Sequence, residues 1–215
     1  MNADYFANHA RARQFPWTLY HQPLERDLER FLGAVASEHP RGEVMVVGCG
    51  LLHEIDAAPS GLGFHVADID ERAVAAVLAR RDPRITGGTV VDPEQPIDQN
   101  RALGAAGRFA AIYAKEVVEH VRAWPGWLTG LRRALMPSGR LWLSTPNYGE
   151  PWLAALESTV LELIARRSGF SRRDLHPTRF SRRSLSRGLV GAGFDQVEVR
   201  VAPSRLALTA WARAR

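Results

Sequence analysis

Short apolar runs alternate with amphipathic segments along the chain, and each run ends in a polar or glycine-rich turn. The clearest run is Val44–Val47, which passes directly into Gly48-Cys49-Gly50. A continuous apolar run that ends in glycines is typical of a buried parallel strand that turns sharply. Further short runs occupy residues 64–67, 89–91, 109–114 and 140–144. We therefore predict a strand at each of these places.

Between these runs, apolar residues recur at spacings of three and four, which is the period of an amphipathic helix. Pro23 is predicted to begin one such helix, and Ser181 to cap the last one. The other predicted helices cover residues 73–78, 127–135 and 150–168, and the last one ends at 191. Two final runs, 197–201 and 206–211, predict a closing hairpin. Strands that alternate with helices imply a mainly parallel sheet, which binds ligands at the carboxyl ends of its strands.

Length and composition favour a single domain, residues 1–215, in an ordinary globular protein. Apolar residues make up 46% of the chain and charged residues 24%. No apolar run approaches the ~20 residues of a membrane span, and no signal-peptide pattern follows Met1. Cys49 is the only cysteine, which fits a reducing compartment. We therefore expect a cytoplasmic protein with no membrane partner.

The net charge of +5 comes almost entirely from arginine, since Lys115 is the only lysine. Arginines cluster at 166–167, 172–173 and 179–187. Clustered guanidinium groups can hold phosphate or carboxylate. The alternative is a solvated helical surface with no ligand.

A glycine turn and a later acid indicate a nucleoside site. Asp68 follows Gly48 by 20 residues, at the end of the next predicted strand. A carboxylate there can accept hydrogen bonds from both hydroxyls of a ribose. A dinucleotide turn would also need glycine or alanine at position 53, where this chain has His53. The pattern therefore disfavours a dinucleotide.

Several short segments, in this order and spacing, carry a resemblance to a known family. They are Val-Val-Gly-Cys-Gly at 46–50, Ala-Asp-Ile-Asp at 67–70, Val-Asp-Pro at 91–93, Lys-Glu-Val-Val-Glu-His at 115–120, Leu-Met-Pro-Ser-Gly-Arg-Leu at 135–141, Ser-Thr-Pro-Asn at 144–147, His-Pro-Thr-Arg-Phe at 176–180 and Gly-Ala-Gly-Phe at 191–194. With them the sequence resembles the class I S-adenosylmethionine-dependent methyltransferases. It is most similar to the branch that contains the ubiquinone-biosynthesis O-methyltransferases. The resemblance implies an α/β fold: a Rossmann-like three-layer sandwich with a mostly parallel seven-stranded sheet and an antiparallel last strand.

The resemblance also implies a role for each matching position. Asp68 would hold the ribose hydroxyls, Ile69 would lie against adenine, and Asp92 would accept from the adenine amino group. The implied cofactor-binding residues are Gly48, Cys49, Gly50, Asp68, Ile69, Asp92, Pro93 and Lys115. The alternative for Asp68 and Asp92 is that they only cap the helices that follow them.

Two positions depart from the family pattern. The family usually has an acid where this chain has Val46, and a third glycine where it has Leu52. Val46 removes a polar group that supports the methionine end of the cofactor, and Leu52 adds bulk beside the turn. Glu54 is a candidate replacement for the missing acid. These departures leave open a non-catalytic, methyltransferase-like protein.

The candidate reacting centre is Glu-Val-Val-Glu-His at 116–120. We predict that it begins a helix, so that Glu116, Glu119 and His120 share one side of a turn. His176 would be the fourth ligand of a divalent cation such as Mg²⁺, Mn²⁺ or Zn²⁺. The pattern resembles metal-assisted O-methyltransferases, including those that methylate the terminal 2′-hydroxyl of small RNAs. Two alternatives stay open: His120 as a metal-free general base, with Glu116 beside the sulfonium, and a purely structural role through the helix dipole.

The acceptor is expected to bind under a lid formed by residues 1–22 and 148–180, which lie outside the common core. Aromatic and arginine side chains in both segments suit a flat or anionic molecule. A small-molecule hydroxyl, or an amine, is the first hypothesis for the acceptor. An RNA 3′-terminal 2′-hydroxyl is the second.

Overall fold

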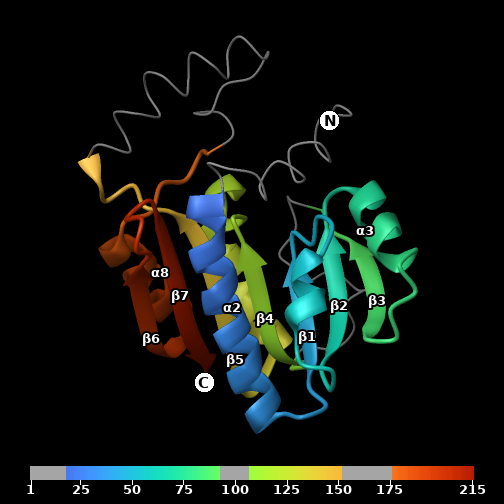
Figure 1. Cartoon of the computed structure of the whole chain (residues 1–215). Helices are drawn as coiled ribbons and strands as arrows, with labels where there is room; N and C mark the ends of the chain where they lie inside the picture. The colour runs from blue at the N-terminus through green and yellow to red at the C-terminus, as the bar shows by residue number, and fades with distance from the viewer. Residues whose placement is uncertain (1–17, 93–106, 152–175) are drawn as a thin grey trace.

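Seven strands form one sheet in the part of the chain that the computed structural model describes, residues 18–92, 107–151 and 176–215. Their order is β3-β2-β1-β4-β5-β7-β6 (Figure 1). The strands are β1 Glu43–Val47, β2 Gly63–Asp68, β3 Ile85–Val90, β4 Phe109–Lys115, β5 Leu135–Pro146, β6 Phe194–Val201 and β7 Ala207–Ala214. The strand β7 runs antiparallel to both of its neighbours, β5 and β6, and the other paired strands of the described residues are parallel. The predicted Rossmann-like fold with an antiparallel last strand is confirmed.

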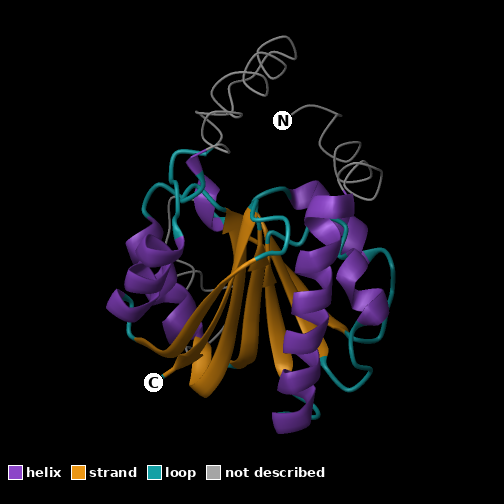
Figure 2. Cartoon of the chain, turned by 60° about the vertical axis from the view of Figure 1, so that its left-hand side comes forward, coloured by secondary structure: helices purple, strands orange, loops and turns teal. Residues whose placement is uncertain are grey.

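Helices cover both faces of the sheet and make a three-layer sandwich (Figure 2). The helical elements are α2 Thr18–Glu38, η1 His53–Ala57, α3 Glu71–Leu78, η4 Val118–His120, α4 Trp124–Ala134 and α8 Arg182–Gly191. Successive side chains of a strand point to opposite faces, so β1 contributes to two apolar clusters. Val44 and Val46 pack with α2 and α3, whereas Met45 and Val47 pack with α4 and α8.

The helix α2 begins at Thr18, so the prediction that Pro23 begins it is wrong. Proline has no N–H, and the carbonyl oxygen of Leu19 therefore loses its usual helical partner. Contacts between this end of α2 and distant parts of the chain compensate for the lost hydrogen bond. Tyr20 reaches a residue at the end of β4, and Leu24 is fully buried. The added turns bring the N-terminal end of α2 to the carboxyl edge of the sheet (Figure 1).

A buried carboxylate attaches the middle of α2 to the sheet. Asp27 Oδ2 accepts hydrogen bonds from the indole N–H groups of Trp142 on β5, at 3.0 Å, and Trp211 on β7, at 2.9 Å. Arg30 and Arg200 lie within ion-pair distance of the other oxygen, Oδ1. This network fixes α2 over β5 and β7 because a buried carboxylate is stable only when it is hydrogen-bonded and paired.

The C-terminal elements follow the predictions. Ser181 caps α8 in a capping box with Ser184, and β6 and β7 pair as an antiparallel hairpin. The predicted helix at 150–168 lies almost entirely outside the described residues. None of the helices in the described ranges is long and apolar enough to cross a membrane.

Candidate functional site

The carboxyl ends of β1, β2, β4 and β5 meet at one edge of the sheet, beside the N-terminal end of α2 (Figure 1). The strand order changes direction at β1, since β2 lies on one side of it and β4 on the other. In open α/β sheets a crevice for ligands forms at such a switch point. The residues that follow these strands therefore form the candidate site.

The turn after β1 has the backbone conformation that its glycines predict. Gly48 and Gly50 both have positive φ, 71° and 49°. A methyl group added at Gly48 would lie 2.5 Å from Cγ2 of Val117, so glycine also allows the segment after β4 to approach. Gly48 N donates to Ala67 O at 2.8 Å. The turn is thus held against both neighbouring strands.

Asp68 holds this turn in place from the end of β2. Its Oδ2 accepts from Gly50 N at 3.1 Å, its Oδ1 accepts from Asp70 N at 3.0 Å, and the residue is 3% exposed. The side chain that caps α3 is Asp70, which accepts from Arg72 N, so Asp68 is not the helix cap. Each carboxylate oxygen retains a second lone pair that can accept from a ligand hydroxyl.

The other predicted cofactor residues differ in how they face this edge. Ile69 is 49% exposed, which is unusual for a large apolar side chain directly after a buried strand. Asp92 is exposed just beyond β3, and Pro93 lies outside the described residues. Cys49 is buried, and both this burial and Asp68 raise the pKa of its thiol far above the usual value. The thiol therefore stays neutral, and the backbone is the part of Cys49 suited to a ligand.

Leu52 has a backbone conformation that favours glycine. Its φ of 50° and ψ of 47° lie in the left-handed region, which costs a non-glycine residue roughly 1–2 kcal/mol. Its side chain is 1% exposed and belongs to the same apolar cluster as Val46. The bulk that Leu52 adds beside the turn therefore lies within the apolar core.

A lysine between two acids follows β4. Lys115 Nζ forms an ion pair with Glu54 of η1 and lies 3.7 Å from Glu25 Oε1 of α2. All three side chains are largely but not fully buried. Glu54 and Glu25 also line a small cavity between η1 and α2.

Glu116 does not begin a helix, and that prediction is wrong. Its φ is 57°, only the short turn η4 follows, and α4 begins at Trp124. The left-handed backbone turns the Glu116 carboxylate toward α2 and β5. There Oε2 accepts from Tyr20 Oη at 2.5 Å and Oε1 accepts from Ser144 Oγ at 2.8 Å. Strained non-glycine residues of this kind cluster at functional sites.

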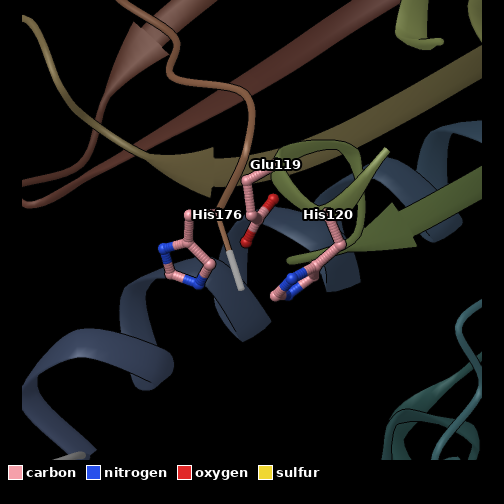
Figure 3. Close-up of side chains that lie close together, drawn as sticks. All are labelled: Glu119, His120 and His176. Atoms are coloured by element: carbon pink, nitrogen blue, oxygen red, sulfur yellow. The ribbon is translucent and has the colours of Figure 1, made fainter. Parts of the chain in front are cut away.

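Glu119, His120 and His176 converge in space (Figure 3). One ligand atom from each lies within 4.8 Å of the others, and the two imidazole centroids are 4.9 Å apart. Glu119 is 1% exposed, whereas His120 is exposed. Glu116 is not part of this group, so the predicted set of four ligands is wrong in that member. The physical reason is the left-handed backbone at Glu116, whose carboxylate is bonded to Tyr20 and Ser144 instead.

A tyrosine and a backbone connection support this group. Tyr148 Oη lies 2.6 Å from His176 Nδ1, which leaves Nε2 as the ring nitrogen suited to bind a ligand. Thr178 N donates to Glu119 O at 3.1 Å, and Thr178 Oγ1 donates to Val121 O. The segment after residue 175 is therefore attached to the turn after β4. Ser144, which donates to Glu116, is a further residue of the site, and its one signal in the sequence is that it is the first polar residue at the end of an apolar run.

Comparisons with known proteins identify the family and the fold. A family model described as a methyltransferase domain matches residues 9–199. No curated protein matches the chain. Among solved structures, the CurJ carbon methyltransferase has a TM-score of 0.67 at 18% identity, over 88% of this chain and 54% of that one. The DszA carbon methyltransferase has a TM-score of 0.64 at 20% identity, over 93% and 55%.

A third similar structure contains ligands. It is the 1,6-didemethyltoxoflavin-N1-methyltransferase of Burkholderia thailandensis with bound 1,6-didemethyltoxoflavin and S-adenosylhomocysteine. It has a TM-score of 0.64 at 16% identity, over 97% of this chain and 86% of that one. The chain spans only about half the length of the CurJ and DszA proteins. These structures share the fold of this chain, and since the family model covers most of the sequence, the chain belongs to the methyltransferase domain family.

Proposed function

We propose that this methyltransferase transfers a methyl group from S-adenosylmethionine to a hydroxyl group of a small-molecule acceptor. The observation that carries the cofactor part is Asp68, whose carboxylate is fixed beside the Gly48–Gly50 turn. Exposed Ile69 adds an apolar surface next to this carboxylate, as an adenine ring requires. Asp68 would hold the ribose hydroxyls, the turn would pass under the ribose, and Asp92 would accept from the adenine amino group.

Methyl transfer depends mainly on how the protein positions the acceptor. The bound cofactor supplies a methyl group on a positively charged sulfur, which is already activated for transfer. The protein must place the acceptor oxygen in line with that methyl group, and it must accept the proton of the acceptor hydroxyl. Glu116 is suited to orienting the acceptor, since Tyr20 and Ser144 fix its carboxylate at the end of β4. His120 is suited to accepting the proton, since its imidazole is exposed close by on η4.

We also propose that Glu119, His120 and His176 bind a divalent cation. Two imidazoles and one carboxylate are a common set for Zn²⁺ or Mn²⁺, whereas Mg²⁺ prefers oxygen ligands alone. Three protein ligands leave a position open, and Tyr148 would orient His176 from behind. A cation here would lower the pKa of a hydroxyl bound to it. In this arrangement His120 is a ligand, and it is the proton acceptor only in the metal-free arrangement.

The two predicted lid segments, residues 1–22 and 148–180, lie largely outside the described residues. In their described parts, Tyr20 belongs to the first segment, and Tyr148 and His176 belong to the second; we propose that these side chains contact the acceptor. Arg179 lies 5.2 Å above the Tyr148 ring, which provides a planar and cationic surface. That surface favours a second candidate acceptor, the 3′-terminal ribose of an RNA, because arginine and tyrosine stack on bases.

Methyl transfer from isotopically labelled S-adenosylmethionine tests the proposal. The panel contains phenols, sugars, amines, carbon nucleophiles and RNA oligonucleotides, and mass spectrometry identifies the methylated atom. We expect O-methylation of a small molecule. Exclusive N- or C-methylation would overturn the hydroxyl acceptor, and methylation of the RNA 3′ end would establish the second candidate. Folded protein that binds no S-adenosylmethionine would instead support the non-catalytic alternative.

A further inference from the structure

The methionine end of the cofactor needs charged partners that this chain lacks at the usual place. That end is a zwitterion, with an α-ammonium and an α-carboxylate group. Val46 stands where an acid is expected, and its side chain is buried in the apolar cluster. If the site binds the complete cofactor, other residues must supply the opposite charges.

Lys115 and Glu54 lie where this replacement is required. Lys115 is on the same face of the sheet as Val46, because Val46 pairs with Tyr113 and side chains alternate along β4. Glu54 lies on η1, directly after the glycine turn. Their ion pair therefore spans the carboxyl ends of β1 and β4, whereas Asp68 lies on the opposite side of β1, at the end of β2. A nucleoside with an amino-acid tail could therefore place its ribose at Asp68 and its tail at the Glu54–Lys115 pair.

The charge balance also fits a zwitterion. Lys115 is one cation beside two carboxylates, Glu54 and Glu25. When the α-ammonium and α-carboxylate groups of the cofactor join these three side chains, every charge still has a neighbour of opposite sign. The Glu54 and Lys115 side chains are 13% and 23% exposed, so they are shielded enough for strong pairing and still open to a ligand.

We propose that Glu54 and Lys115 form the subsite for the amino-acid end of S-adenosylmethionine. Lys115 binds the α-carboxylate, and Glu54 binds the α-ammonium group. This subsite compensates for the acid that is missing at Val46. The proposal rests on cofactor binding at the carboxyl edge, and its test separates the two.

Calorimetry with two ligands provides that test. S-Adenosylhomocysteine has the amino-acid end, and 5′-methylthioadenosine has the same nucleoside without it. In Glu54→Gln and Lys115→Met, we expect the affinity for S-adenosylhomocysteine to fall about 10–100-fold, the usual effect of losing a charge-assisted hydrogen bond. We expect the affinity for 5′-methylthioadenosine, measured directly or by displacement, to change less than about 3-fold.

Two further variants distinguish recognition from structural support. Glu29→Gln removes an exposed acid that lines the same cavity, and we expect it to leave both affinities unchanged. The charge swap Glu54→Lys with Lys115→Glu keeps an ion pair between the two positions but places a carboxylate beside Glu25, so we expect it to bind S-adenosylhomocysteine no better than the single variants, with thermal unfolding as the check that it folds. An unchanged ratio of the two affinities in Glu54→Gln and Lys115→Met would overturn the subsite. If the wild-type protein binds neither ligand, the proposed cofactor site fails, and the subsite fails with it.

Discussion

Tyr20 Oη donates a 2.5 Å hydrogen bond to Glu116 Oε2, although 96 residues separate the two in sequence. Burial raises the pKa of the Tyr20 phenol well above its usual value, and the charge of Glu116 raises it further. The phenol therefore stays protonated and remains the donor throughout the neutral range. This bond connects the N-terminal end of α2 to the strained residue after β4.

Replacing Tyr20 by phenylalanine removes this bond and keeps the ring. Because the acceptor is a carboxylate in a partly buried place, we expect the free energy of unfolding to fall by about 1–2 kcal/mol. Urea denaturation measures this change. Leu19→Ala on the same turn is the control, and it should change stability by less than about 0.5 kcal/mol because Leu19 is exposed. Equal stability of Tyr20→Phe and wild type would show that the bond contributes nothing.

Asp27 should contribute more to stability than Tyr20, because two indole N–H groups donate to it, one buried and one partly buried. In Asp27→Ala we expect the free energy of unfolding to fall by about 2–4 kcal/mol. Glu29→Ala, on the exposed face of the same helix, is the control and should have little effect. Chemical denaturation of both variants at pH 7 checks the prediction.

The effect of Asp27 should also depend on pH. Burial would raise the pKa of its carboxyl, but hydrogen bonds from Trp211 and Trp142 outweigh burial and lower it. A lowered folded-state pKa means that the carboxylate contributes its full stability above the unfolded value of about 3.9. That contribution is lost as the pH falls through the folded-state pKa. The stability difference between wild type and Asp27→Ala should therefore narrow at acidic pH, and a constant difference from pH 7 to pH 2 would contradict this assignment.

Leu52 offers a test of backbone strain against burial. Leu52→Ala should cost about 3–5 kcal/mol through the lost apolar side chain. Leu52→Gly loses slightly more side chain but relieves the left-handed conformation, and we expect it to be about 1 kcal/mol more stable than Leu52→Ala. Both variants should remain less stable than wild type, because burial outweighs strain. If Leu52→Gly is the less stable of the two, the strain at this position is negligible.

Metal binding can be measured without any acceptor. Titration with Zn²⁺ or Mn²⁺ should show one site per chain, which His120→Ala and His176→Ala abolish. Tyr148→Phe should weaken binding about 10–100-fold, since it removes the group that orients His176. Affinity should fall as the pH is lowered, because protons compete for the imidazoles. Glu116→Gln should leave metal affinity unchanged, and a large loss in that variant would restore Glu116 as a ligand.

The order of strands and helices could be predicted from the sequence because each element has its own local signal. Apolar runs ending at Gly48 or Asp68 identify buried strands, and Ser181 identifies a helix start. The positions of Asp68 and Ile69 at the ligand edge follow from the same signals, since polar residues after parallel strands meet at one edge.

The geometry around Glu116 could not be predicted in this way. Helical spacing placed Glu116, Glu119 and His120 on one side of a turn, but a left-handed backbone at Glu116 interrupts it. The Glu116 carboxylate is bonded to Tyr20 and Ser144, which are distant in sequence, and no local pattern pairs them with Glu116. Interactions of this range are visible only once the chain is folded.

The most direct test of the cofactor site is calorimetry with S-adenosylhomocysteine on wild type and Asp68→Asn. We expect wild type to bind one molecule per chain and Asp68→Asn to bind about 10–100-fold more weakly, because the charged acceptor for the ribose hydroxyls is lost. Asp70→Ala, which removes the helix cap beside it, should lower stability and leave affinity within about 3-fold. Equal binding by wild type and Asp68→Asn, or no binding by folded wild-type protein, would contradict a cofactor site at this edge of the sheet.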